Sequence, residues 1–245
     1  MIELNTFSIT ARCDHSGMLG VAVSTAVPAV GAICQYVKAG VGAIATQSWV
    51  NPYLGIDGLK LLEQGMSAQE ALDSLIANDP GRDDRQLGIV DAQGRAAAYT
   101  GVSCVDWAGH EIGAGFSIQG NMLVGAATVA QMAKAAEHSR PLDLPERLML
   151  VLEAGQIAGG DKRGKQSAAL KVFHVEEYPW LDLRVDEHRN PVAELRRILG
   201  VAQHQLLPFV GGMPTRKNPL GGIPSEVTDM LMRPPSFRPG GNGGS

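Results

Sequence analysis

The chain carries a threonine close to its start that could act as a nucleophile. Thr6 opens an alternating segment, where Thr6 and Ser8 point to one face because their spacing is two. A Thr hydroxyl is weakly nucleophilic at neutral pH and needs a base. A free α-amine, with a pKa near ~8, can be that base if residues 1–5 are removed. The alternative is a strand hydroxyl that is buried and hydrogen-bonded to backbone.

Amide side chains form a second group of polar residues. Gln47 and Asn51 lie in "TQSWVNPYLG", between a glycine-rich strand and a helix, and Asn121 ends the strand segment "IQGN". Amides beside a helix N-terminus suit a carboxylate or an oxyanion, so we predict that these three residues bind substrate. Asn51 directly before Pro52 is also typical of a helix N-cap without a binding role.

The loop "GGDKRGKQS" at positions 159–167 alternates glycine with charges of both signs. Arg163 can hold a carboxylate through two parallel hydrogen bonds, and Asp161 can grip an amine or orient Arg163. Gln166 and Ser167 end the loop. We therefore predict that Asp161, Arg163, Gln166 and Ser167 bind a small-molecule ligand. The alternative is a surface loop with one ion pair.

Composition excludes several classes of protein. The 245 residues carry a net charge of −4 and 5% aromatic residues, which argues against nucleic-acid binding. The three Cys form no CxxC pair and the six His show no HxH or HExxH spacing, so we expect no metal site and no cofactor. The longest apolar region, 27–46, contains Gln35 and Lys38 and is unsuited to spanning a membrane. No signal peptide is visible, and we expect a cytoplasmic protein.

Hydrophobic periodicity, capping residues and turn residues predict the elements that position these side chains. Strands are expected at 4–12, 18–27, 31–37, 40–48, 85–101 (a hairpin), 115–123, 165–175 and 181–187, and helices at 52–65, 67–79, 126–139, 145–158 and 190–206. Strands in antiparallel groups between helix pairs predict an α+β fold, with two sheets face to face and helices outside. We assign residues 1–207 to one domain and 208–245 to a Pro/Gly-rich tail of irregular structure.

Motifs along the chain closely resemble a bacterial domain-of-unknown-function family, the one numbered 1028. They run in order through positions 6–199: "TFSITA", "GVAVST", "AGVGAIATQ", "NPYLGIDGLKLLEQG", "RQLGIVDAQGRAAAYTG", "QGNML", "ERLMLVLEAGQIAGGDKRGKQSAAL" and "DLRVDEHRNPVAELRRIL". That family is considered similar to the N-terminal-nucleophile (Ntn) hydrolases, whose fold is a four-layer αββα sandwich.

The resemblance implies that Thr6 stands where an Ntn nucleophile would stand. The wider superfamily mostly cleaves amide bonds, with a Thr, Ser or Cys that autoproteolysis exposes. Its members with a proteasome-like site carry an Asp after the first hairpin, whereas this chain reads "STAVPAV" there.

Three functional hypotheses follow. The first is an Ntn-type amidohydrolase that acts on a small polar amide. The second is a non-catalytic relative that binds a small metabolite or a partner protein, and the third is a scaffold protein. The scattered apolar residues of the tail and the habit of the superfamily lead us to expect a homodimer.

Overall fold

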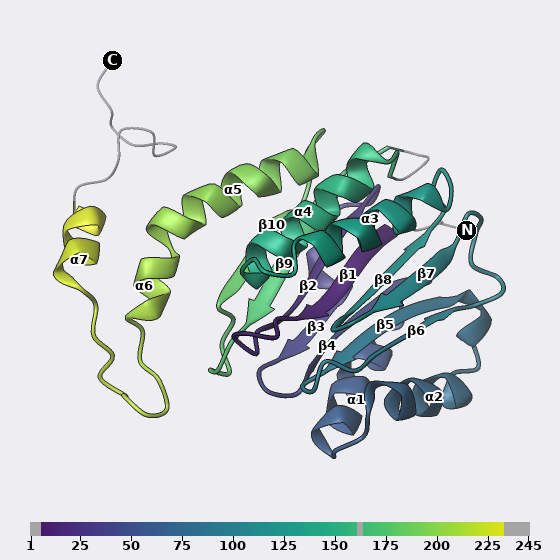
Figure 1. Ribbon diagram of the computed structural model, residues 1–245, viewed down its shortest axis with the longest axis horizontal. Coiled ribbons are helices and arrows are strands. Elements are labelled where there is room, and N and C mark those ends of the chain that lie inside the picture. Colours follow the sequence, from purple (N-terminus) through teal and green to yellow (C-terminus); the bar gives the residue numbers. More distant parts are fainter. Residues whose placement is uncertain (1–5, 161–163, 233–245) are drawn as a thin grey trace. The chain divides into compact units, whose positions relative to one another are not determined.

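The described chain is a mixed assembly of helices and strands, with its strands in two antiparallel sheets (Figure 1). The structure is a computed structural model and describes residues 6–160 and 164–232. The chain divides into two compact units, Met1–Arg196 and Arg197–Ser245, which are described separately. The expected α+β class is confirmed. None of the described helices is long and apolar enough to cross a membrane.

The larger sheet has six strands in the order β10-β9-β2-β1-β8-β7. These strands are β1 (Thr6–Arg12), β2 (Leu19–Thr25), β7 (Gly109–Gly113), β8 (Phe116–Asn121), β9 (Ser167–Phe173) and β10 (Leu181–Val185). β1 and β2 form the predicted hairpin, in which Gly17 adopts a positive φ of 72° at the turn. β1 also pairs with β8, which ends far along the sequence at Asn121.

The smaller sheet has four strands in the order β3-β4-β5-β6. These strands are β3 (Gln35–Lys38), β4 (Gly42–Ser48), β5 (Arg85–Asp91) and β6 (Ala96–Thr100). The predicted strand 31–37 is wrong in its first half, which forms a short 3-10 helix, η1 (Val30–Ala32). Ala29, which directly precedes this helix, adopts a left-handed φ of 55°. The chain therefore turns at this point and does not continue as an extended strand. β7 was not anticipated, because "GHEIG" has no alternating apolar pattern.

Two helices, α1 (Pro52–Glu63) and α2 (Ala68–Asn78), pack on the smaller sheet (Figure 1). Their apolar side chains, such as Leu54 and Leu72, form a core with Ile44 and Leu87 of the strands. α2 begins with the predicted capping box of Ser67 and Glu70. A second short 3-10 helix, η2 (Arg82–Asp84), leads from α2 into β5.

The helices α3 (Ala127–His138) and α4 (Leu144–Ile157) lie along the larger sheet (Figure 1). Gly155 of α4 sits over Phe7, where a Cβ atom would come within 2.9 Å of the ring. Gly20 of β2 is similarly close to Leu148 of α4. Since neighbouring residues of a strand face opposite ways, Phe7 faces α4 while Thr6 and Ser8 face the other sheet.

The facing surfaces of the two sheets lie close together. Leu19, Val21 and Val23 of β2 pack against Val37 of β3 and Ala43 of β4. Further along, a Cβ atom on Gly88 would lie 2.0 Å from Oε1 of Gln119. Small residues in these strands therefore leave room for side chains from the opposite sheet.

The second unit continues the helix α5 (Pro191–Gln205), which begins in the first unit. It then contains α6 (Leu207–Gly211) and α7 (Ser225–Met232). The backbone N–H of Gly222 donates to the carbonyl of Gly212, which ties two parts of the connecting segment together. The described part of the segment after Pro208, which ends at Met232, is therefore more regular than its Pro and Gly content predicts.

The contact at Gly88 predicts a stability difference between two glycine substitutions. Gly88→Ala should lower the free energy of unfolding by about 1–3 kcal/mol, because the methyl group overlaps the buried amide of Gln119. Gly125→Ala is the control, since a Cβ atom there meets nothing within 4 Å and no positive φ opposes it. Urea denaturation measures both. Equal stability of the two variants would contradict this description of the sheet contact.

Candidate functional site

A buried network of neutral side chains joins the two sheets. Ser8 Oγ on β1 donates to Gln47 Oε1 on β4 at 2.6 Å and accepts from Gln119 Nε2 on β8 at 2.7 Å. Ser117 Oγ donates to Gln119 Oε1 at 2.8 Å. We call the following six side chains the inter-sheet network: Ser8, Gln47, Gln86, Ser117, Gln119 and Asn121. Each of them is at most 1% exposed.

Gln86 on β5 occupies the centre of the inter-sheet network. Its Oε1 accepts from Gln47 Nε2 at 2.7 Å and from Asn121 Nδ2 at 3.0 Å. Its Nε2 shares two N–H groups among three acceptors: the Gly120 carbonyl at 2.8 Å, Thr100 Oγ1 at 2.9 Å and the Gly109 carbonyl at 3.1 Å. Gln86 was not among the residues predicted from the sequence. One feature of the sequence could have indicated it: Gln86 precedes the apolar stretch of a predicted strand, at a position that faces inward, where a buried amide needs hydrogen-bond partners.

Thr6 lies at the edge of this network, in a row of polar residues that crosses four strands. In register, Ser167 of β9 pairs with Thr25 of β2, Thr25 pairs with Thr6, and Thr6 pairs with Asn121 of β8. We call these four residues the Thr6 row. Thr6 Oγ1 donates to Thr25 Oγ1 at 3.3 Å, and the Thr6 carbonyl accepts from Gln47 Nε2 at 3.4 Å. The structure thus brings Thr6, Gln47 and Asn121 together.

Backbone strain gathers next to the same residues. Ser48 follows Gln47 with φ at 65°, and Met122 follows Asn121 with φ at 52°. Residues other than Gly seldom adopt this left-handed conformation, which costs energy and concentrates at functional sites. Two strands that supply the network therefore end in strained residues at the edge where Thr6 lies.

Asn51 has a different local role from Gln47. Its Oδ1 accepts from the backbone N–H of Tyr53 at 3.1 Å, which makes it the N-cap of α1. Its Nδ2 lies 3.5 Å from Asp79 Oδ2, and Asp79 is paired with Arg85 at 2.8 Å. These hydrogen bonds lead away from the inter-sheet network. A role for Asn51 in substrate binding stays a prediction.

The residues of the predicted binding loop divide into two groups. Asp161 and Arg163 lie outside the described residues. Ser167 Oγ donates to the Val27 carbonyl at 2.6 Å and accepts from the Val30 N–H at 3.2 Å, so its hydroxyl organises the turn before η1. Gln166 donates its backbone N–H to the Thr25 carbonyl at 2.8 Å. Ligand binding by these four residues stays a prediction.

Charged and titratable groups lie outside the inter-sheet network, and His110 reaches it through Thr100 Oγ1, which accepts from Gln86 Nε2. Lys38, at the far end of β3 and β4 from Gln47, forms an ion pair with Glu63. His110 Nδ1 lies 2.8 Å from Thr100 Oγ1, and partial burial of the ring lowers the pKa of His110. Burial raises the pKa of the Cys104 thiol. Across residues 6–160 and 164–232, no three His, Cys, Asp or Glu residues gather closely enough to hold a metal ion.

Comparison with known proteins gives a family without an assigned function. Residues 6–195 match the family described as "Family of unknown function (DUF1028)". A DUF1028 protein from Silicibacter pomeroyi has a crystal structure similar to this one, with 29% sequence identity and a TM-score of 0.83. The match covers 90% of this chain and 96% of that one.

Anbu, the ancestral β-subunit from Yersinia bercovieri, has 10% identity and a TM-score of 0.38, over 80% of this chain and 94% of that one. At that TM-score the similarity supports no inference. A search of curated proteins finds no match.

The central position of Gln86 predicts a large loss of stability on its removal. Gln86→Leu should lower the free energy of unfolding by about 3 kcal/mol, because buried amides of Gln47 and Asn121 lose their acceptor. Gln131→Leu, at an exposed position of α3, is the matched control and should change stability by about 0.5 kcal/mol or less. Urea unfolding tests both. A stable Gln86→Leu protein would contradict the importance of the network.

Asp79 predicts a pH-dependent difference in stability. Burial acts to raise the pKa of Asp79, but hydrogen bonds from Arg85 and from the Gly81 N–H outweigh it and lower the pKa. The contribution of Asp79 is therefore complete above its unfolded pKa of about 3.9, and is lost as pH falls through the lower folded pKa.

Asp79→Asn should destabilise the protein at pH 7, and its deficit relative to wild type should shrink below about pH 4. Urea unfolding across this pH range measures the difference. Asp73→Asn on the exposed face of α2 serves as control and should have little effect throughout. A deficit for Asp79→Asn that stays constant with pH would refute the assigned pKa direction.

Proposed function

We propose that this chain, which belongs to the DUF1028 family, is an Ntn-type amide hydrolase in which Thr6 is the nucleophile. The proposal includes the four-layer αββα sandwich of that superfamily. The observation that carries it is the position of Thr6 at the strained edge of the inter-sheet network, between Thr25 and Asn121. Helix pairs on both sheets, and sheets that face each other, support the fold assignment.

Thr6 needs a free α-amine to act in this way. In the maturation step, Thr6 Oγ bonds to the carbonyl carbon of residue 5, and the carbon–nitrogen bond to Thr6 breaks. The hydroxyl proton passes to the leaving nitrogen. Water then hydrolyses the ester, which releases residues 1–5 and leaves the α-amine of Thr6 as a base.

Turnover repeats the same chemistry on a substrate. The α-amine accepts the proton of Thr6 Oγ while the oxygen attacks the amide carbonyl carbon. The leaving amine takes that proton, and water hydrolyses the ester to release the acid and regenerate Thr6. Asn121 Nδ2 has a second N–H besides the one that it donates to Gln86 Oε1, and this N–H would be a neutral donor for the carbonyl oxygen. The neutrality of this donor favours a small polar amide over a strongly charged substrate.

A non-catalytic, metabolite-binding relative is the second candidate. The side chains of the inter-sheet network bond mainly to one another, and Lys38 is paired with Glu63 on the far side of the smaller sheet. Lys38 is therefore not placed to assist a nucleophile at Thr6. This second candidate predicts an intact N-terminus and ligand binding without turnover.

Intact-mass spectrometry of the purified protein, followed by an assay on a panel of small neutral amides, tests the proposal. Wild type and Thr6→Ser should lose residues 1–5 and hydrolyse an amide, whereas Thr6→Ala should stay uncleaved and lose turnover entirely. Lys38→Met is the control and should process and turn over like wild type. A wild-type protein that remains full length and inactive would favour the binding relative instead.

A further inference from the structure

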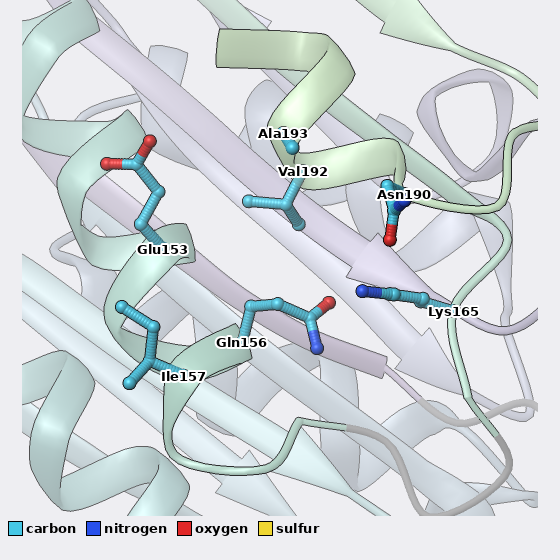
Figure 2. Close-up of a pocket in the computed structure, with 7 residues that line it drawn as sticks. All are labelled: Glu153, Gln156, Ile157, Lys165, Asn190, Val192 and Ala193. Atoms are coloured by element: carbon cyan, nitrogen blue, oxygen red, sulfur yellow. The ribbon is translucent and has the colours of Figure 1, made fainter.

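A cavity of about 280 Å³ lies at the C-terminal end of α4, on the helix-covered side of the larger sheet (Figure 2). Gln156 and Ile157 of α4 form one wall, and Val192 and Ala193 at the start of α5 form another. Lys165, which precedes β9, closes a third side. All of these residues belong to the first unit. A volume at the low end of ligand pockets favours a small molecule.

Gln156 leaves an acceptor unused inside this cavity. Its Oε1 is buried and has no hydrogen-bond partner among residues 6–160 and 164–232. A buried carbonyl oxygen without a donor is costly, and native proteins seldom keep one without a reason. Figure 2 shows the Gln156 side chain extending from α4 toward the space between Lys165 and Asn190. A ligand that presents an N–H group to Oε1 would satisfy this oxygen.

Lys165 supplies positive charge to the same space. Its side chain is exposed, and its ammonium group points toward Gln156 in Figure 2. The backbone N–H groups of Val192 and Ala193 lie in the first turn of α5, where the helix dipole also favours an anion. Glu153, in the wall of the cavity, has both carboxylate oxygens engaged by Arg196 at 2.8 and 2.9 Å, and Arg196 also pairs with Glu146.

The cavity and the Thr6 row lie on opposite faces of the larger sheet. A Cβ atom on Gly155, one residue before Gln156, would touch the Phe7 ring, so this part of α4 covers the face that Phe7 points to. Thr6, which directly precedes Phe7 in β1, points to the opposite face. A ligand in the cavity would therefore not meet the Thr6 hydroxyl, and this site does not depend on the proposed hydrolase function.

We infer that this cavity binds a small N-acyl amino acid or a similar molecule. Its carboxylate would lie between Lys165 and the start of α5, and its amide N–H would donate to Gln156 Oε1. Its apolar side chain would pack on Ile157, Val192 and Ala193. The three features of the cavity, one anion site, one acceptor and one apolar wall, match these three groups.

Isothermal titration calorimetry with N-acetyl-L-leucine tests the site on the full chain. Two analogues each lack one group: N-acetyl-L-leucinamide has no carboxylate, and 4-methylpentanoate lacks the acetamido group with its N–H. Wild type should bind N-acetyl-L-leucine saturably. It should bind each analogue with an affinity at least about tenfold lower. Absence of saturable binding to N-acetyl-L-leucine would overturn the inference and assign the cavity to water alone.

Two variants assign the contacts. Lys165→Met should weaken N-acetyl-L-leucine about tenfold and leave the leucinamide unchanged, while Gln156→Leu should weaken N-acetyl-L-leucine and leave 4-methylpentanoate unchanged. Gln156→Leu should also keep its melting temperature, since it removes a buried acceptor that has no partner in the described part of the chain. If either variant weakens all three compounds alike, the assigned contact is wrong.

Two further variants serve as controls. Lys134→Met, at an exposed position of α3, should bind all three compounds like wild type. Thr6→Ala should also bind N-acetyl-L-leucine normally. Loss of binding in Thr6→Ala would show that the cavity and the Thr6 row form one site, which contradicts their placement on opposite faces of the larger sheet.

Discussion

The contact between Gln47 and Gln86 is the interaction on which the arrangement of the two sheets depends. These side chains come from paired positions of β4 and β5, and through Ser8 and Asn121 they bond to the opposite sheet. Buried amides stabilise a protein only when their donors and acceptors are satisfied, so each member of the network fixes the position of the next. Gly88 follows from this constraint, because a larger residue would displace the amide of Gln119.

Neutrality of the network also limits the chemistry at Thr6. Amides and hydroxyls can hold a polar group in a defined place without the desolvation penalty of a buried ion. They are poor proton acceptors at neutral pH, so a base must come from elsewhere. Under the proposed function that base is the α-amine of Thr6, which exists only after cleavage of the chain. Strain at Ser48 and Met122 lies where this rigid interior meets the loops.

The sequence predicted most elements because local signals marked them, such as Asn51 and Pro52 at the start of α1 and the Ser67–Glu70 capping box of α2. It also identified Gln47 and Asn121 as polar residues at strand ends. It could not identify Gln86 as their common partner, because that contact depends on register between distant strands. The local sequence also did not predict β7, because "GHEIG" contains few residues that favour strands. Its pairing with β8 outweighs this low strand propensity.

Alternation along β1 explains how one strand can contribute to the two proposed sites. Thr6 faces the inter-sheet network, whereas Phe7 lies under Gly155 of α4, next to the cavity that contains Gln156. The packing of Phe7 holds both the end of α4 and the start of β1, so a ligand that orders the cavity would act on Thr6 only through this ring. Coupling between two sites requires that a ligand bind one arrangement of the shared element more tightly than another. Since the Phe7 ring is closely packed and 1% exposed, it leaves little room for a second arrangement, and the two sites should bind independently.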